Sequence, residues 1–409
     1  PAPAAAGPPP LAVPILFAVV FIDLVGFGIL APLVPFYVER LGARPELITL
    51  IIALHPLAQS LAMPLWGAAS DRFGRRPVLL ASMFGHAVAY AAIGFAPSLW
   101  FLAGARVLSG ATSANLSTAY AYVSDVTTPE QRAGAMGRIS AAFGLGFAVG
   151  PAIGGFLAGG DTMADANLAR PALAAAAFSG VAFLAILAFL PETRSASARA
   201  AAAAAPDGFG TNFRRVAARP VVRLMLAMAT IVLAFMAARE SIFPLWASHE
   251  HALAPRTLGG LLAWSGFLVF ALQFFGTGRL VDRFGELALV RTALLCLLVG
   301  WLGLTLAINV PTLLLAMTIA AFGTAFFQTC MQSLLSKRAG AAERGVVLGV
   351  YQSSSAMARF VGQAGAGTLY GQLGANAPFL LGSLAMLPAL VLAGRIGQRL
   401  AAPAGAGLR

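Results

Sequence analysis

The stretch GAASDRFGRRPVLL, residues 67–80, places small residues, one carboxylate and three arginines between two long apolar runs. Its ASDRFG core at 69–74 returns 211 residues later as LVDRFG at 280–285. A second segment, QRAGAMGRISAAFGLGFAVGPAIGGFLAGG at 131–160, aligns without gaps to ERGVVLGVYQSSSAMARFVGQAGAGTLYGQ at 343–372. Two separate motifs that recur at nearly the same offset indicate a chain built from two related halves.

The composition is that of a membrane protein. Hydrophobic residues make up 59% of the 409 residues and charged residues only 10%, whereas soluble domains carry about 45–50% and about 25%. A helix that spans a bilayer needs about 20 apolar residues, so the chain has room for about twelve spans. A single soluble core is excluded, and no nucleophile–base set, metal-ligand spacing or nucleotide-binding loop indicates an enzyme.

Clusters of charges, proline and glycine separate the apolar runs and mark the ends of the predicted spans. The runs of the first half lie near 14–37, 46–70, 78–96, 98–123, 133–158 and 171–190. Those of the second half lie near 221–247, 257–281, 288–308, 311–336, 345–371 and 376–394. The first run is too long for a signal-peptide core, so an uncleaved span is expected there. The prediction is an all-α membrane protein with twelve transmembrane helices in two pseudo-symmetric six-helix bundles.

The longest polar stretch, 191–220, lies midway along the chain and is predicted to be a cytoplasmic linker. It separates an N-terminal six-helix bundle at 1–190 from a C-terminal one at 221–409. The gapless alignment pairs Arg132 with Arg344, Gly137 with Gly349, Gly150 with Gly362 and Gly155 with Gly367.

Lys and Arg are distributed asymmetrically between the two sides of the predicted bundles. With the N-terminus inside, twenty of the 27 fall in cytoplasmic segments, and the outer loops hold only Arg40, Arg44, Arg170 and Arg256. Loops rich in Lys and Arg stay in the cytoplasm, so both termini are expected there, in a bacterial inner membrane. The net charge of +12 is then a consequence of topology, and the expected partner is the lipid bilayer rather than nucleic acid.

Asp23 lies about ten residues, or about 15 Å of helix, from the cytoplasmic end of the first run, near the bilayer midplane. An ionised group there costs about 2.5–3.5 kcal/mol even on lenient insertion scales, which makes Asp23 a functional candidate. Burial disfavours the charged form and a nearby cation favours it, so a conformational change that alters either loads or unloads a proton. We predict that Asp23 is a protonation site; the alternative is a static packing residue.

Three arginines and one more acid also fall inside predicted spans. Arg106 in the fourth run needs a carboxylate, a substrate or backbone carbonyls as its partner, and Asp23 is the expected carboxylate. Arg239 and Glu240 are adjacent in the seventh run and point about 100° apart, so they do not simply neutralise each other. Glu240 is either a second proton site or the partner of Arg359 in the eleventh run.

The fifth run carries glycines at three- and four-residue spacing, which form a small-residue face for close helix packing. The face comprises Gly144, Gly146, Gly150, Gly154 and Gly155. Pro151 lies among them and is expected to kink the helix. The second half has Gln363 at the matching position, so only the first half carries the full pattern.

Polar and aromatic residues with few charges suit a cavity for a largely apolar ligand that has several hydrogen-bonding groups. The candidates for substrate binding are Gln59, Thr112, Asn115, Tyr122, Trp246, Gln273, Gln328 and Gln332. Gln59 and Gln273 fall at equivalent depths in the second and eighth runs and are the preferred pair. The alternative for each residue is a hydrogen bond to a neighbouring helix.

Four segments carry a family resemblance: 67–80, GFAVGPAIGG at 146–155, RVLSGATSANLSTAYAYVSD at 106–125 and FIDLVGFGILAPLVP at 21–35. Their order and spacing resemble those of the drug:proton antiporters of the major facilitator superfamily, with the TetA-type tetracycline antiporters as the closest pattern. The resemblance implies a role for Arg106 in proton coupling. It also implies that the glycine face packs against the other half and seals one conformation.

Residues of the duplicated loops and of the surrounding charges are predicted to control the conformational change. They are Gly67, Asp71, Arg72, Gly74, Arg75, Asp125, Asp282 and Arg359, together with the glycine face and Pro151. Gly67 and Gly74 are expected to permit a tight turn and close helix approach, and Asp71 to accept hydrogen bonds from an arginine or a helix N-terminus.

Two positions depart from the TetA pattern. That pattern has an acid in the third span, where this chain has Ala89, and a histidine in the eighth span, where it has Val269. Because those groups are associated with the metal–tetracycline substrate, their absence favours a pump for other amphiphiles over a tetracycline-only pump. None of the four histidines replaces them at a matched position, and His249 with His251 alone is a weak metal site.

These features predict a proton-coupled exporter of amphipathic drugs or xenobiotics, tetracycline-like compounds included, that works as a monomer by alternating access. Protons are the coupling ion, and no cofactor is expected. The alternative on the same fold is an exporter or importer of an endogenous metabolite, such as a siderophore or a glycolipid. A non-transporting membrane receptor is a remote alternative, which would show no proton-linked counterflow.

Overall fold

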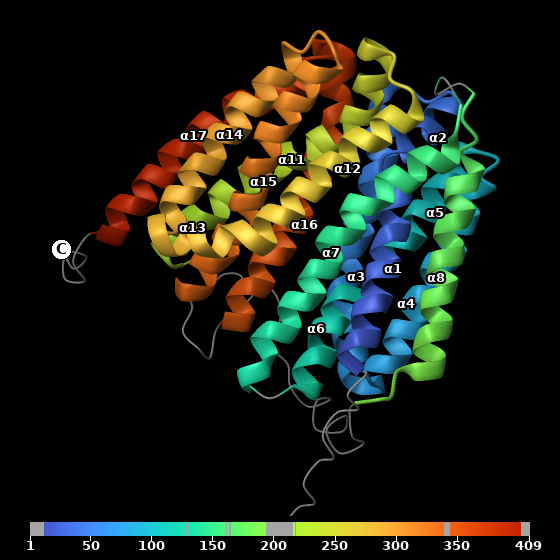
Figure 1. The fold of residues 1–409 in the computed structure, drawn as a ribbon, viewed down its shortest axis with the longest axis horizontal. Coiled ribbons are helices and arrows are strands. Elements are labelled where there is room, and N and C mark those ends of the chain that lie inside the picture. Colours follow the sequence, from blue (N-terminus) through green and yellow to red (C-terminus); the bar gives the residue numbers. More distant parts are fainter. Residues whose placement is uncertain are drawn as a thin grey trace, which may run out of the picture. The chain divides into compact units, whose positions relative to one another are not determined.

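The computed structural model describes residues 12–113, 115–127, 129–160, 162, 165–193, 216, 218–338 and 344–401. Every regular element in these ranges is a helix (Figure 1). The first half contains α1 (Ala12–Leu30), α2 (Val34–Arg40), α3 (Pro45–Phe73), α4 (Arg75–Gly94), α5 (Leu99–Ala111), α6 (Asn115–Val126), α7 (Pro129–Ala158) and α8 (Ala169–Phe189). The second half contains α11 (Pro220–His251), α12 (Pro255–Ala271), η1 (Leu272–Gly276), α13 (Thr277–Phe284), α14 (Glu286–Thr305), α15 (Val310–Arg338), α16 (Arg344–Leu373) and α17 (Ala377–Ala401).

Each predicted apolar run coincides with one helix or with consecutive helices. Nine helical segments of the described chain are long and apolar enough to cross a bilayer, and shorter apolar helices lie at Leu99–Ala111 and Gly144–Ala158. The chain is therefore an all-α, multi-pass membrane protein. The count of twelve spans stays a prediction.

Three of the predicted continuous spans are interrupted, which corrects the prediction at those points. Pro32 has no N–H and its ring crowds the preceding turn, so the first run divides into α1 and α2. The fourth run divides after Thr112, and the eighth contains the π-helical turn η1. Turns of this kind are rare and frequently lie at functional sites.

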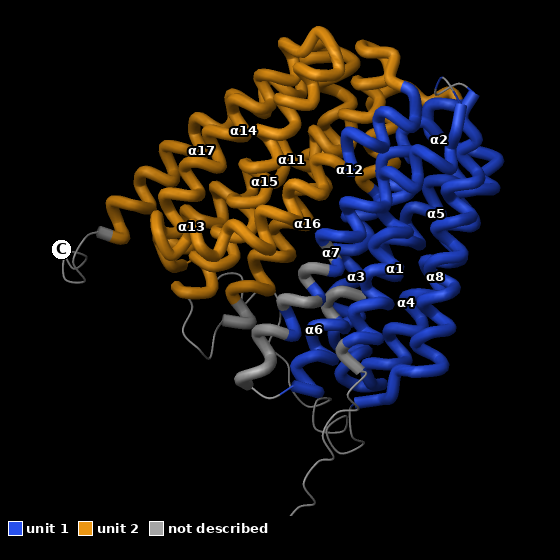
Figure 2. The backbone as a smooth tube through the Cα atoms, viewed as in Figure 1, with its two compact units in different colours: residues 1–41, 54–206, 254–263 blue, residues 42–53, 207–253, 264–409 orange. Residues whose placement is uncertain are grey.

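Two compact units make up the structure (Figure 2). Unit 1 comprises residues 1–41, 54–206 and 254–263, and unit 2 comprises residues 42–53, 207–253 and 264–409. The units follow the two halves of the chain except at the start of α3 and the start of α12. The predicted division at the linker separates residues by their order in the chain, whereas these units are defined by contacts between residues.

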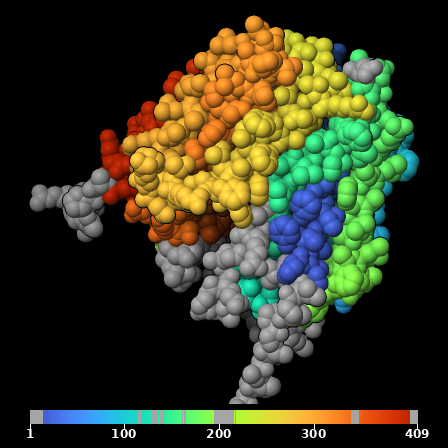
Figure 3. Space-filling view, viewed as in Figure 1, coloured from blue at the N-terminus to red at the C-terminus, as the bar shows by residue number. Residues whose placement is uncertain are grey.

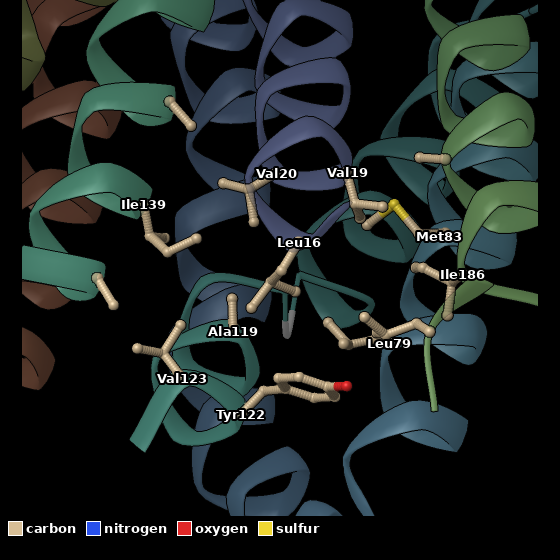
Figure 4. Packing of buried hydrophobic residues seen from close by; sticks show 14 residues of the cluster. Leu16, Val19, Val20, Leu79, Met83, Ala119, Tyr122, Val123, Ile139 and Ile186 are labelled. Carbon is tan, nitrogen blue, oxygen red and sulfur yellow. The ribbon is translucent and has the colours of Figure 1, made fainter. Parts of the chain in front are cut away.

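In unit 1, α1 packs against both α7 and α8, and the blue surface of α1 is visible between theirs (Figure 3). A buried apolar cluster joins α1, α4, α6, α7 and α8, with Leu16, Met83, Ile139 and Ile186 among its members (Figure 4). Because lipid tails are as apolar as leucine, the cluster stabilises the unit through close packing rather than through removal of apolar surface from water.

One duplicated glycine lies at the same helix crossing in both units. Gly150 of α7 lies against Gly28 of α1, and a methyl group at Gly150 would come within 2.6 Å of the Gly28 Cα. Its aligned partner Gly362 of α16 lies against Ala234 of α11. These helices hold the first and fifth runs of one half and the seventh and eleventh of the other. The repeat in sequence is therefore a repeat in packing.

A second aligned pair explains why two short segments change units. Gly155 of α7 lies against the Pro255 carbonyl at the start of α12. Gly367 of α16 donates its N–H to Thr49 Oγ1 in the first turns of α3, at 2.9 Å. Both glycines leave no room for a side chain, so the start of α12 packs into unit 1 and the start of α3 packs into unit 2.

Gly150→Ala is expected to destabilise the protein by about 1–3 kcal/mol, because the added methyl group overpacks the crossing of α1 and α7. Gly180→Ala in α8 is the matched control, since its methyl group would meet no described atom within 4 Å and alanine is the better helix former. Thermal unfolding of the purified variants in detergent measures the difference. Equal midpoints for the two variants would contradict the close crossing.

Candidate functional site

Asp23 of α1 is enclosed by protein, with only 4% of its surface exposed. Its Oδ1 lies 2.8 Å from Nδ1 of His86 in α4. His86 is 3% exposed, and the ring of Tyr90 stacks on the imidazole with 5.4 Å between centroids. The structure thus forms a buried carboxylate–imidazole pair between α1 and α4.

His86 was not among the predicted site residues. The comparison with the TetA pattern set His86 aside because it does not stand at the matched position, which is 89 in this run and holds alanine. An ionisable residue three positions earlier lies on the same side of the helix, because residues at this spacing are neighbours on a helix surface. A titratable side chain inside an apolar run was therefore the signal that identifies His86.

The second ring nitrogen of His86 faces the break between α5 and α6. Nε2 lies 3.2 Å from the Ser109 carbonyl oxygen and 3.1 Å from Ser113 Oγ. The Ser113 N–H bonds to the Gly110 carbonyl, and the Ser113 hydroxyl donates to the Ser109 carbonyl at 2.8 Å. The Ser109 carbonyl has lost its α-helical donor at the helix end, and side chains replace it.

Two more side chains bond to carbonyls at this break. Ser82 of α4 donates to the Thr112 carbonyl, and Trp66 of α3 donates to the Ala111 carbonyl. Non-helical backbone at membrane depth is tolerated where protein groups satisfy it in this way. Thr112 was predicted to contact substrate, but its hydroxyl bonds back to its own helix and its side chain fills the space beside Gly85.

Arg106 lies on α5, 5% exposed, three residues before Ser109. The Ser109 hydroxyl donates to the Arg106 carbonyl at 3.1 Å. Arg106 and Asp23 both lie within electrostatic range of Tyr90 in unit 1. Asp23 lies within hydrogen-bonding distance of His86, and pairing with Arg106 stays a prediction.

Arg75 is the centre of a charge cluster at the 67–80 loop. Its guanidinium bonds to Asp71 at 2.8 Å and to Asp125 at 3.0 Å. The two acids come from α3 and α6, while Arg75 itself begins α4. One buried arginine therefore ties three helices together, and a bond to the Ser70 hydroxyl at 2.9 Å completes the cluster.

Glu192, just beyond α8, caps the start of α4. Its carboxylate accepts the backbone N–H of Arg75 at 3.0 Å and that of Arg76 at 3.1 Å, where the helix dipole favours negative charge. Gly74 precedes these residues with a φ of 107°, and a side chain there would collide with the Glu192 carboxylate. Sequence reasoning missed Glu192 because it falls in the predicted linker. The feature that could have indicated it is an acid at the end of an apolar run, close to several arginines.

The second copy of the loop is built differently. Asp282 is exposed, and no described atom lies within 4 Å of a Cβ placed on Gly285, whose φ is 78°. The acid that is bonded is Glu286, which accepts from Ser333 at 3.0 Å and from Lys337. The duplicated sequence therefore does not duplicate the charge cluster.

Two residues of the 67–80 loop lie apart from the Arg75 cluster. Gly67 is inside α3 rather than in the turn, and a Cβ there meets no described atom within 4 Å. The prediction of a turn and a close approach at Gly67 is wrong, because Gly74 alone makes the turn. Arg72 is exposed, with its guanidinium 5.3 Å from the centre of the Phe73 ring.

The glycine face of α7 lies along α1. Gly146 lies against Leu24, and Gly154 lies against the Ile29 carbonyl. Pro151 is inside α7, which continues through it, and the predicted kink stays a prediction. A row of small residues thus lets the two backbones approach along several turns.

In unit 2, Arg239 and Glu240 approach to 4.0 Å between Nη2 and Oε1, the outer limit of an ion pair. Glu240 also acts electrostatically on Arg359 of α16, and the Arg239 guanidinium lies 5.9 Å from the centre of the Phe243 ring. Arg239 and Arg359 thus both lie within electrostatic range of Glu240. Proton carriage by Glu240 and gating by Arg359 stay predictions.

The structure brings some of the predicted glutamines together. Gln273 lies on η1, and its amide donates to Gln328 of α15 at 3.4 Å. Gln332 follows one turn later on α15 and is exposed. Gln59 is half-buried on α3 in unit 1, so its pairing with Gln273 stays a prediction. The side chain of Asn115 lies outside the described residues.

Two predicted binding residues are enclosed by protein instead. Trp246 is buried and donates its indole N–H to Asn376 at 2.9 Å. Tyr122 is fully buried and donates its hydroxyl to the Pro191 carbonyl at 3.0 Å, within the cluster of Figure 4. Both aromatic rings pack while their polar tips find a partner, which is the usual arrangement for buried Trp and Tyr. Neither is open to a ligand in this structure, which corrects the prediction.

Asp23 and His86 are both ionisable side chains, and they lie within hydrogen-bonding distance of each other inside unit 1. In the part of the chain that the structure describes, no three His, Cys, Asp or Glu side chains come together to hold a metal ion. A model of one protein family matches this chain at residues 16–239 and again at 240–403. The chain belongs to the Major Facilitator Superfamily. The two matches divide this facilitator into two parts, as does the sequence repeat.

This facilitator is similar to bacterial drug-resistance proteins. It is 31% identical over 275 residues to the tetracycline resistance protein, class C, of Escherichia coli, which covers 66% of this chain and 68% of that one. It is 25% identical over 384 residues to multidrug resistance protein 2 of Bacillus subtilis (strain 168), which covers 92% and 93%. The crystal structure of the human organic anion transporter MFSD10 superposes with a TM-score of 0.72 at 25% identity, covering 94% of this chain and 100% of that one.

Gly74→Ala and Gly285→Ala form a matched pair of variants of this facilitator. Both glycines have backbone angles that are almost restricted to glycine, so each substitution is expected to cost about 1–3 kcal/mol. Gly74→Ala is expected to cost more, because the methyl group also displaces the Glu192 cap. Thermal unfolding in detergent compares the two variants. A higher unfolding midpoint for Gly74→Ala than for Gly285→Ala would contradict the role of Glu192 as a cap.

Proposed function

We propose that this facilitator is a proton-coupled antiporter that exports amphipathic drugs or xenobiotics across the bacterial inner membrane, with both termini in the cytoplasm. The observation that carries the proposal is the buried Asp23–His86 pair, 2.8 Å apart. An ionisable pair enclosed by helices is costly to maintain and is a functional feature by default in a membrane protein. Alternating access exposes such a pair to one side of the membrane and then to the other.

The proton gradient is sufficient for this exchange. A membrane potential contributes about 2.3 kcal/mol per charge for each 100 mV, so one entering proton can drive the export of one substrate molecule against a useful gradient. Protons are the proposed coupling ion, with no cofactor. The proposed working form is a monomer in the lipid bilayer.

The proposed substrate is largely apolar and has several hydrogen-bonding groups. Amides of Gln273 and Gln328 supply donors and acceptors in unit 2 without a net charge. The names of the tetracycline and multidrug resistance proteins support a drug-like molecule. Because Ala89 and Val269 replace the polar groups of the TetA pattern, we propose a range of amphiphiles rather than tetracycline alone.

Asp23→Asn is expected to abolish proton-driven transport, because the amide keeps a hydrogen bond to His86 but cannot release a proton. The measurement uses proteoliposomes with an acidic interior, in which protons that leave drive a probe inward. Tetracycline, ethidium and the organic anion fluorescein are the probes. Asp165→Asn is the control, since this acid is exposed and its carboxylate accepts a hydrogen bond from Thr162 in the same turn, and it should match the wild type.

Three outcomes decide the proposal. Gradient-driven uptake of tetracycline or ethidium by the wild type, lost in Asp23→Asn, supports it. Uptake that Asp23→Asn leaves intact contradicts the role of the pair. Uptake of fluorescein alone contradicts the proposed substrate class and favours organic anions, the class named for the human relative.

A further inference from the structure

We infer that His86 holds the coupling proton jointly with Asp23, and that this proton clamps α1 to the break between α5 and α6. The inference rests on the proposed antiport and names a residue that was not among the site residues predicted from the sequence. It follows from which atoms surround the imidazole, since each neighbour restricts where hydrogens can be.

The Nε2 side of the ring requires a hydrogen. Nε2 lies 3.2 Å from the Ser109 carbonyl, which can only accept, and 3.1 Å from Ser113 Oγ. The Ser113 hydroxyl directs its own hydrogen to the Ser109 carbonyl, so its oxygen also accepts from the ring. Both contacts are hydrogen bonds only if Nε2 carries a hydrogen.

The Nδ1 side then requires one more proton. Nδ1 lies 2.8 Å from Asp23 Oδ1. An ionised carboxylate only accepts, so Nδ1 carries the second hydrogen and the ring is an imidazolium. The other arrangement is a neutral ring with a protonated carboxyl that donates to Nδ1. In both arrangements the pair holds one proton more than a carboxylate beside a neutral imidazole.

Release of that proton breaks one of the two contacts. An O–H or N–H bond of the pair breaks, the proton passes to water, and no electron is transferred. The neutral ring then has a single hydrogen for two acceptors, Asp23 on one side and the Ser109 carbonyl on the other. Either Asp23 or the Ser109 carbonyl then loses its hydrogen bond to the imidazole, so a change in proton occupancy changes which helices His86 holds together.

The break is suited to respond to this change, because its carbonyls have lost their helical donors and depend on individual side chains. Ser82 and Trp66 bond to the carbonyls that follow Ser109, and His55 of α3 bonds to the Ser109 hydroxyl at 2.9 Å. Among the described residues, titratable or charged neighbours of the pair and the break include His55 on α3, Tyr90 on α4 and Arg106 on α5. A titration measured here must therefore be assigned with variants of His86 and Asp23.

His86→Asn and His86→Gln test the inference in the same proteoliposomes. Asn places an amide near the Nδ1 position and Gln places one near Nε2, so each preserves a hydrogen bond without a titrating group. With ethidium or tetracycline as the probe, both variants are expected to keep counterflow in the absence of a gradient and to lose gradient-driven uptake. His249→Asn, at an exposed histidine bonded to Tyr370, is the control and should keep both.

The outcomes separate this inference from the proposed function. Counterflow without gradient-driven uptake in the wild type contradicts the antiport itself. Gradient-driven uptake that survives in either His86 variant contradicts only the inference, because a structural histidine is replaceable by an amide and a proton carrier is not.

A spectroscopic measurement on the wild type covers the case in which the variants do not fold. Nitrogen NMR of ¹⁵N-histidine, with infrared detection of the carboxyl group, follows both members of the pair as the pH rises. The expected result is that the wild type loses an imidazolium signal or a carboxylic acid signal as the pH rises. Asp23→Asn is expected to show no such loss. Signals of the pair that stay constant over the range in which histidine titrates would overturn the inference.

Discussion

A buried acid beside a buried imidazole constrains every helix around it. In an apolar interior neither Asp23 nor His86 is tolerated without a partner, because an isolated charge there has a large desolvation penalty. Their contact at 2.8 Å ties α1 to α4, and the second nitrogen of the ring ties α4 to the end of α5. In the proposed mechanism, the packing of unit 1 depends on where one proton resides, which is a property that a purely apolar helix bundle does not have.

Two of the three helix interruptions in this protein coincide with polar groups. The fourth predicted span breaks where side chains from α3 and α4 bond to carbonyls that have lost their helical donors. The eighth contains a π-helical turn that bears Gln273. Backbone irregularity in a membrane protein needs such local partners, because lipid supplies none. The places where the helices are irregular are consequently the places where polar chemistry concentrates.

The two halves share their packing but not their charges. Gly150 and Gly362 hold equivalent helix crossings, since close approach of two backbones depends only on the absence of a side chain. The loop charges do not repeat: Arg75 joins Asp71 and Asp125, whereas Asp282 is exposed and Glu286 takes the bonds of Ser333 and Lys337. The repeat is therefore kept in the helix crossings and has diverged in the loop charges.

The amino-acid sequence by itself determined that the chain is helical, lies in a membrane and consists of two related parts, because run length, composition and repeats are properties of consecutive residues. It also singled out Asp23, Arg75 and Gly150, whose types are unusual for their surroundings. Only the tertiary structure decided that His86 pairs with Asp23, that Glu192 caps α4, and that Tyr122 and Trp246 are enclosed. Each of these depends on a contact between residues far apart in the chain, and hydrophobic periodicity records which face of a helix is apolar but not which helix it meets.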